Sequence, residues 1–163
     1  MIRAAANAFA LSLALATAAG AEAPQRVANG QQFGAWTVTC EAVAVGETTC
    51  LLSQSLLRAS DRAFLAQLLV LWSGDGQQRY LAARVPLGTY LAAGLAIKPQ
   101  SADDAGIVTL VWQSCDMRFC EALIALDDAL LAALAAPEET IIASYRPSLV
   151  SEPLVFRFSM EGA

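Results

Sequence analysis

The sequence has 163 residues, a length that suits one domain. Its hydrophobic fraction of 56% against a charged fraction of 15% excludes an intrinsically disordered chain. With 10 Lys and Arg against 15 Asp and Glu the net charge is -5, which argues against a nucleic-acid partner, because binding phosphates needs a basic surface. The chain contains no histidine, so it lacks a Ser-His-Asp triad, a Cys-His pair and a histidine metal site.

Residues 1–21 are predicted to be a secretory signal peptide. One arginine precedes an almost wholly apolar stretch, residues 4–18, and Ala19-Gly20-Ala21 is a small-x-small cleavage site. We therefore expect cleavage between Ala21 and Glu22. A transmembrane anchor is the weaker alternative, because the apolar stretch falls short of the ~20 residues that a span needs. Two later apolar runs are too short or too charged to span a bilayer, so we expect no transmembrane segment in the mature chain.

The mature chain is predicted to begin with a flexible lead-in, residues 22–32, followed by a single domain, residues 33–163. Residues 36–40 alternate apolar and polar side chains, which predicts a strand. A second strand is expected from Cys50 onward, after a loop that contains Gly46. Because an exported chain meets an oxidising compartment, the four cysteines are expected to form disulfides.

Four cysteines allow three pairings, and the strand pattern favours the local one. Cys40–Cys50 and Cys115–Cys120 would each flank a hairpin loop, where facing Cα atoms lie about 4.5–5.5 Å apart and within disulfide reach. Each bridge should contribute roughly 2–3 kcal/mol to stability. A zinc site is the weaker alternative, because zinc-binding cysteines usually occur as C-x2-4-C pairs, and a thioredoxin-like centre needs C-x-x-C. We therefore expect structural disulfides and no metal.

The remaining chain alternates short apolar runs with turn signals. Strands are predicted over residues 81–85, 90–97, 107–115, 120–126, 140–145 and 154–160. In the last of these, Leu154, Phe156, Phe158 and Met160 are expected on one face. Asp127 predicts the N-cap of a short helix near residues 127–135, which Pro137 follows. Residues 60–72 are ambiguous, since Asp61 can cap a helix and the apolar spacing is near-helical; propensity alone favours a helix.

Five ordered motifs resemble those of the invasion-associated locus B family, small exported proteins of alphaproteobacteria. Residues 33–40 (FGAWTVTC) and 50–54 (CLLSQ) resemble the family's opening. The order continues with Pro86-Leu87-Gly88 and residues 115–122 (CDMRFCEA), and it ends with residues 159–162 (SMEG). The resemblance covers most of the chain from Phe33 onward.

The resemblance implies an all-β fold, a compact antiparallel β-sandwich with one short helix, in which residues 60–72 are largely a strand. It implies an exported, non-catalytic protein located in the periplasm, on the outer membrane or outside the cell, and linked in a few pathogens to invasion of host cells. No catalytic residue and no cofactor follow from it. We expect a protein partner at the cell envelope or surface; the alternative is a periplasmic accessory protein for envelope integrity or protein folding, with no host contact.

Acidic doublets are the remaining candidates for catalysis. Asp103-Asp104, Asp127-Asp128 and Glu138-Glu139 each supply two carboxylates, which glycosidase-type chemistry requires, but neighbours on a strand point to opposite faces. We interpret them as a solvated turn, a helix cap and a solvated lead-in to a strand, and we expect no enzyme.

Other conspicuous side chains are given structural interpretations. Trp36, Trp72 and Trp112 are expected in the core. Lys98, the only lysine, is expected in a loop. Gln54 is expected to bond a neighbouring loop through its amide.

Overall fold

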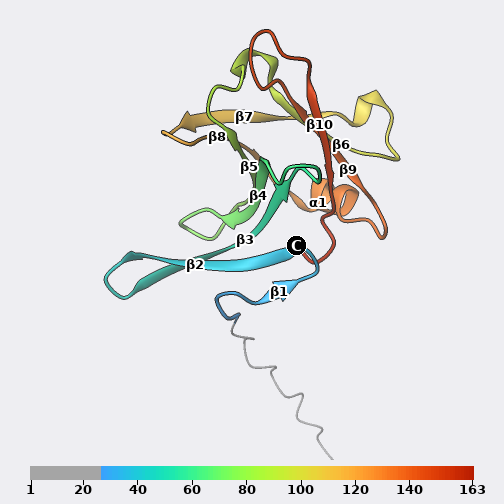
Figure 1. Cartoon of the computed structure of the whole chain (residues 1–163). Coiled ribbons are helices and arrows are strands. Elements are labelled where there is room, and N and C mark those ends of the chain that lie inside the picture. The colour runs from blue at the N-terminus through green and yellow to red at the C-terminus, as the bar shows by residue number, and fades with distance from the viewer. Residues whose placement is uncertain (1–26) are drawn as a thin grey trace, which may run out of the picture.

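The structure is a computed structural model that describes residues 27–163 (Figure 1). The predicted signal peptide, its cleavage between Ala21 and Glu22, and the first part of the lead-in lie outside the described residues. Further along the expected lead-in, Gly30 and Gln31 form backbone hydrogen bonds with Val38, so the chain already lies against the first long strand at that point.

Ten antiparallel strands form one continuous sheet in the order β1-β2-β3-β4-β5-β8-β7-β6-β9-β10. Their bounds are β1 Gln32–Phe33, β2 Trp36–Ala44, β3 Glu47–Leu57, β4 Phe64–Trp72, β5 Arg79–Pro86, β6 Leu95–Pro99, β7 Val108–Cys115, β8 Phe119–Ala125, β9 Ile141–Tyr145 and β10 Leu154–Phe158. One α-helix, α1 Asp128–Leu134, and two 3-10 turns, η1 Leu91–Ala93 and η2 Asp104–Gly106, complete the described part.

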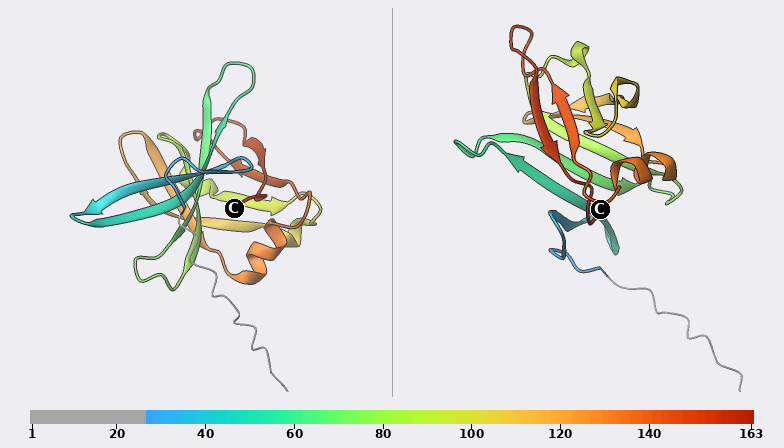
Figure 2. Two further views of the ribbon diagram at one scale, coloured as in Figure 1. Left: turned by 90° about the horizontal axis from the view of Figure 1, so that it is seen from below. Right: turned by 90° about the vertical axis from the view of Figure 1, so that its right-hand side faces the viewer.

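Strand β7 carries the sheet from one layer to the other. Its first residues, as far as Leu110, pair with β6, and from Val111 onward it pairs with β8. The sheet bends there, so that β6, β9 and β10 cross over β4, β5 and β8 as a second layer (Figures 1 and 2). This arrangement confirms the predicted β-sandwich with one short helix.

The core fills the space between the two layers. The largest fully buried side chains are Trp36, Leu68, Leu69, Leu81, Val85, Leu95, Ile97, Leu110, Leu126, Leu134, Ile141 and Met160. On β10 the predicted alternation is confirmed, because Phe156 and Phe158 are buried, with Met160 just beyond them, and Leu154 is half-buried. Strand period therefore fixes which face of β10 packs on the first layer.

Residues 60–72 form a strand from Phe64 onward, as the family resemblance implied and against helix propensity. β4 pairs with β3 on one side and β5 on the other, so its backbone groups are satisfied in the sheet. Asp61 does not cap a helix; its carboxylate accepts a hydrogen bond from the backbone N–H of Ala63 at 3.1 Å in the turn that precedes β4. Tertiary pairing has overridden a weak local preference.

The predicted helix is confirmed at the predicted place. Asp127 is its N-cap, and its side chain accepts a hydrogen bond from the backbone N–H of Leu130 at 2.8 Å. Leu134 is buried and anchors the two-turn helix on the core.

Three local predictions were wrong. The strand expected from residue 90 begins only at Leu95, because η1 precedes it and Gly94, at φ 75, breaks the extended run. Lys98 lies within β6 rather than in a loop, and its Nζ donates to the carbonyl oxygen of Ala102 and to Asp104. Gln54 is a strand residue of β3, as expected, but it is buried and its Oε1 has no hydrogen-bond partner among the described residues, so it does not bond a loop through that atom.

The C-terminal turn packs on the turn between β1 and β2. The indole Nε1 of Trp36 donates to the carbonyl oxygen of Ser159 at 3.0 Å. Gly162, at φ +90, lies so close to β1 that an added Cβ would stand 2.4 Å from the carbonyl oxygen of Phe33. The opening and the closing motifs of the sequence are therefore in direct contact.

Replacing Gly162 with alanine should lower the melting temperature, because the left-handed backbone strains any L side chain and the methyl group overlaps Phe33. Strain of this kind costs roughly 1–3 kcal/mol. Thermal unfolding followed by circular dichroism measures it. Gly74→Ala is the matched control, since a Cβ there meets nothing within 4 Å and its φ is not left-handed. Equal melting temperatures for the two variants would show that the C-terminal turn contributes nothing to stability.

Candidate functional site: a hairpin arm and an apolar cleft

All four cysteines form the two local disulfides that the strand pattern favours. The Cα atoms of Cys40 and Cys50 lie 4.0 Å apart, and those of Cys115 and Cys120 lie 3.9 Å apart. Each bridge joins directly opposite residues of neighbouring antiparallel strands. Facing residues come closest at pairs that exchange no hydrogen bonds, which suits a short cross-link.

The Cys115–Cys120 bridge closes a tight loop, as predicted. The carboxylate of Asp116 accepts hydrogen bonds from the backbone N–H groups of Arg118 and Phe119. These bonds favour the charged form and lower the pKa of Asp116. Cys120 is buried in the core, so this bridge belongs to the body of the sandwich.

The Cys40–Cys50 bridge joins the two strands of a hairpin whose turn contains Gly46, as predicted, but the loop is shorter than expected because both strands continue beyond the cysteines. β2 continues to Ala44 and β3 begins at Glu47, joined by a tight turn in which Gly46 has φ 77. All residues from 41 to 50 are exposed. We call residues 41–49 the arm; Figures 1 and 2 show it projecting away from the two layers as a two-stranded ribbon.

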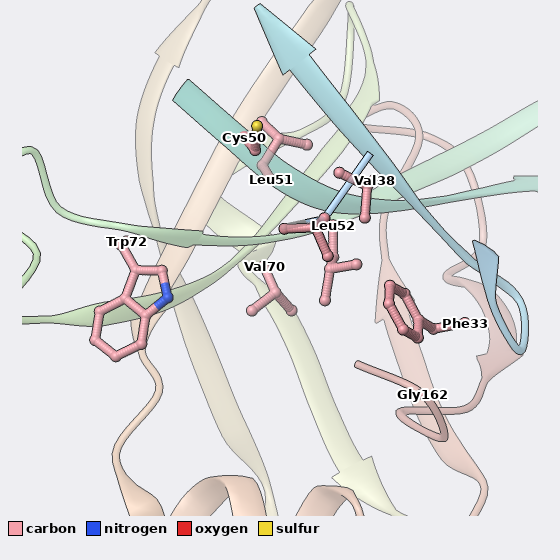
Figure 3. Close-up of a pocket in the computed structure, with 9 residues that line it drawn as sticks. Phe33, Val38, Cys50, Leu51, Leu52, Val70, Trp72 and Gly162 are labelled. Carbon is pink, nitrogen blue, oxygen red and sulfur yellow. The ribbon is translucent and has the colours of Figure 1, made fainter. Parts of the chain in front are cut away.

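An apolar cleft opens where the arm leaves the body of the protein. Its volume is about 380 Å³, and it is lined by Val27, Phe33, Val38, Cys50, Leu51, Leu52, Val70, Trp72 and Gly162. Figure 3 shows the side chains of Phe33 and Trp72 on opposite sides of this space, with Val38, Leu52 and Val70 between them. These residues belong to the segment before β1, to β1, β2, β3 and β4, and to the C-terminal turn, so only the folded chain assembles the cleft.

Trp72 forms one wall of the cleft, and its predicted place in the core was wrong. Its side chain is 53% exposed, whereas Trp36 is fully buried and Trp112 is half-buried. Trp72 is the last residue of β4 and lies opposite Arg79, the first residue of β5. The guanidinium of Arg79 lies 5.5 Å from the ring centroid, a cation–π contact that holds the indole in place.

The acidic doublets lie in different surface turns and bond locally. Asp103 caps η2 through the N–H of Ala105, and Asp127 caps α1. Their neighbours form ion pairs, Asp104 with Lys98 and Asp128 with Arg79. Glu138 lies exposed beside Glu139, whose carboxylate accepts hydrogen bonds from Ser101. Within residues 27–163, no three His, Cys, Asp or Glu side chains gather in a way that could hold a metal ion.

The carboxyl groups with resolved shifts all have a lowered pKa. The hydroxyl and N–H of Ser101 lower the pKa of Glu139, and the hydroxyl of Ser73 lowers that of Asp75. A carboxylic acid that donates a proton near neutral pH needs a raised pKa, so these shifts go in the opposite direction. Burial raises the pKa of Tyr145, whose hydroxyl donates to the carbonyl oxygen of Leu65.

Among the residues that the structure describes, no helix is both long enough and apolar enough to cross a membrane.

The fold and the site together define a small disulfide-bonded β-sandwich domain with a projecting hairpin and an apolar cleft at its base. The chain belongs to the invasion associated locus B protein family, whose model matches residues 36–163. This confirms the family resemblance of the sequence motifs.

A solved structure shares the fold. The crystal structure of invasion associated protein b from Bartonella henselae is similar with a TM-score of 0.63 and 16% sequence identity, over 81% of this chain and 87% of that chain. At this identity the likeness establishes the fold alone. No curated protein matches the chain.

Sequence reasoning missed both the arm and the cleft. The residues between Cys40 and Cys50 include AVAVG, in which apolar residues follow one another with no polar alternation, so nothing marks them as strand. A usable signal was the isolated Gly46, because tight hairpin turns require a positive φ that glycine adopts readily.

Proposed function

We propose that this protein is a non-catalytic binding module of the cell envelope that holds a protein partner through the arm and the cleft. The proposal rests on one observation: the arm is exposed along its whole length, and an apolar cleft lies at its base. A two-stranded ribbon without core contacts is marginally stable in water, so the arm adds little to the fold. Exposed apolar clefts rimmed by polar surface are typical of binding sites.

Location and biological role belong to the same proposal. Two disulfides suit an oxidising compartment outside the cytoplasm, and membership of the family agrees with a place in the envelope. We assign the protein to the periplasm, with attachment to the outer membrane or secretion as the routes to the cell surface. The family description and the name of the Bartonella henselae protein refer to invasion, which supports an adhesive role in host contact.

The non-catalytic part of the proposal draws on the acidic side chains. Asp103 and Asp127 are engaged in caps, and Asp104 and Asp128 in ion pairs. Glu139 accepts hydrogen bonds from Ser101, and Glu138 is exposed. Replacing any of them by its amide should leave partner binding unchanged while the fold is intact. An activity that disappears with one such change would favour an enzyme instead.

Replacing Trp72 with alanine should strongly weaken capture of the partner from envelope extract by the immobilised mature protein. Aromatic anchors in apolar pockets commonly contribute 2 kcal/mol or more, so we expect a loss of at least about tenfold. Because Trp72 is largely exposed, the melting temperature should change little. Val155→Ser, at a residue of β10 with 57% exposure, is the matched control and should capture normally. Equal capture by the Trp72 variant and the wild type would contradict the proposed site.

Protease treatment of intact cells separates adhesion from the accessory role. A protein that is cut on intact cells stands at the surface and can act as an adhesin. A protein that is protected until the outer membrane is opened fits the periplasmic accessory role, in which the same site would bind an envelope protein without host contact.

A further inference from the structure

The outer edge of β2 is occupied over only part of its length. Residues 29–31 cover its first half: the N–H of Gly30 donates to the carbonyl oxygen of Val38, and the N–H of Val38 donates to that of Gln31, both at 2.8 Å. At Cys40 the N–H donates at 3.0 Å to the side-chain Oδ1 of Asn29, which takes the place of a strand carbonyl. The backbone groups of Val38 and Cys40 therefore point away from β3.

Beyond Cys40 this edge is open. Hydrogen-bonding direction alternates along an antiparallel strand, so the N–H and C=O of Ala42 also point away from β3. Ala42 still pairs in regular register with Thr48, and the irregularity begins only after it. No strand among residues 27–163 pairs with this edge beyond the reach of β1. Proteins usually block such edges with charged side chains (lysine above all), proline, a bulge or a covering loop. The arm residues include no lysine and no proline, and the register irregularity lies beyond Ala42, so Ala42 itself is open to pairing.

We propose that this edge of the arm accepts an extended segment of the partner protein as an additional antiparallel strand, with basic side chains on one face and an apolar side chain at its end in the cleft. The inference rests on the proposed function and specifies how the partner is held. Main-chain hydrogen bonds supply affinity in strand addition, and pockets for alternate side chains supply specificity.

The two faces of the arm dictate the chemistry of the added strand. Cys40, Ala42 and Cys50 share a face with Val38, which leads into the cleft, so apolar side chains belong there. Glu41 is on the opposite face, where it can pair with a basic side chain on the neighbouring strand. The arm residues include two glutamates, Glu41 and Glu47, and no cation.

This charge argues for a basic partner and against a second copy of the chain. Two arms placed edge to edge would bring four glutamates together without any cation, and the whole protein has a net charge of -5. Like charges across neighbouring strands are destabilising, whereas a lysine opposite Glu41 is favourable.

A synthetic peptide tests the proposal directly. The probe is the capped hexapeptide Lys-Val-Lys-Val-Lys-Phe, which presents lysines on one face and valines with a terminal phenylalanine on the other. We expect it to bind the mature protein, and to bind more weakly when phenylalanine is changed to alanine, when lysines are changed to glutamates or when salt is raised. No binding, or equal binding of the glutamate peptide, would overturn the proposal.

Methylated peptides identify the binding mode. Only one edge of an added strand faces β2, so methylation of one alternating set of backbone nitrogens should abolish binding, while methylation of the other set should leave it intact. Equal affinity of the two methylated isomers would overturn strand addition.

Two proline variants, at the directly opposite residues Ala42 and Thr48, test which edge of the arm the partner occupies. Ala42→Pro removes an N–H on the open edge of β2 and should lower the affinity for the peptide by about tenfold. One hydrogen bond to the added strand is lost, and the proline ring hinders its approach. Thr48→Pro removes the N–H that faces the other edge and leaves the open edge of β2 intact, so it should weaken peptide binding less than Ala42→Pro does. Circular dichroism and the melting temperature verify that both variants fold.

The reverse order of affinities would place the partner on β3 and overturn the inference. The envelope-capture experiment separates this inference from the proposed function. If the Ala42→Pro variant captures the Trp72-dependent partner as the wild type does, strand addition is wrong while the binding function stands. If the wild-type protein captures no Trp72-dependent partner, the proposed function itself fails.

Discussion

Replacing Trp36 with alanine is expected to destabilise the protein by about 3–5 kcal/mol, the range for removing a buried aromatic side chain. Trp36 is completely buried, begins β2 and contacts the C-terminal turn through its indole N–H. Since domains of this size have a stability of roughly 5–15 kcal/mol, the loss approaches the whole free energy of unfolding. Urea unfolding measures it as a lower midpoint with an unchanged slope.

Trp36→Phe is the control that separates packing from hydrogen bonding. Phenylalanine retains most of the apolar volume but leaves the carbonyl oxygen of Ser159 without its indole donor. An unpaired acceptor costs roughly 1–3 kcal/mol when it is buried. Ser159 is half-buried, so we expect a loss at the lower end of that range, which places this variant between the wild type and the alanine variant. A loss below 1 kcal/mol for alanine would show that the region around Trp36 tolerates a cavity, and that the contact between the two chain ends is dispensable.

Elements whose information is local could be predicted from the sequence. The helix requires a cap and a few apolar residues at the right spacing, and Asp127 with Leu130, Leu131 and Leu134 supplies both. β10 requires only alternation, which Phe156 and Phe158 display clearly. The pairing of the cysteines followed from the same logic, because each pair lies on neighbouring strands of one hairpin.

The candidate site could not be predicted, because its properties depend on where distant strands end. Trp36 and Trp72 illustrate this: each is a terminal residue of a strand, with one apolar and one hydroxyl-bearing neighbour in sequence, yet one is buried and the other forms an open wall. The C-terminal turn covers Trp36 from 123 residues away in sequence. Among residues 27–163 no segment covers Trp72 in the same way, and no local pattern encodes that difference.

The arm could not be predicted either, because it lacks contacts with the core. A strand is recognisable in a sequence when one of its faces is buried, because burial imposes the alternation of polar and apolar residues. Beyond Cys40 neither face is buried, so the pattern disappears although the backbone pairing continues. Loss of alternation within a paired hairpin therefore marks the point where a strand leaves the core, and in this protein that point coincides with the disulfide.

Removing the two disulfides should have unequal effects, in an order opposite to the one that loop length predicts. The sequence separations are 10 for Cys40–Cys50 and 5 for Cys115–Cys120. Chain entropy assigns about 2.8 kcal/mol to the longer loop and about 2.2 kcal/mol to the shorter one. We expect that changing Cys115 and Cys120 together to serine lowers the melting temperature by roughly 5–10 °C, and that the Cys40, Cys50 double serine variant lowers it by less.

The reason lies in the native state. Removing a disulfide destabilises a protein because the unfolded chain gains conformational entropy. If the folded state also becomes more mobile without the bond, it gains entropy too, and the net loss of stability is smaller. Cys120 is buried between β5 and β7, so the core keeps the shorter loop in place. The arm has no such contacts among the described residues and should fray once its disulfide is lost.

Amide hydrogen exchange of the Cys40, Cys50 variant should then show lost protection confined to residues 41–50. This variant should also capture less partner, whereas the Cys115, Cys120 variant should capture normally in its folded fraction. A larger fall in melting temperature for the arm variant would show that the arm is part of the cooperative fold, which would remove the reason for regarding it as a surface kept free for binding.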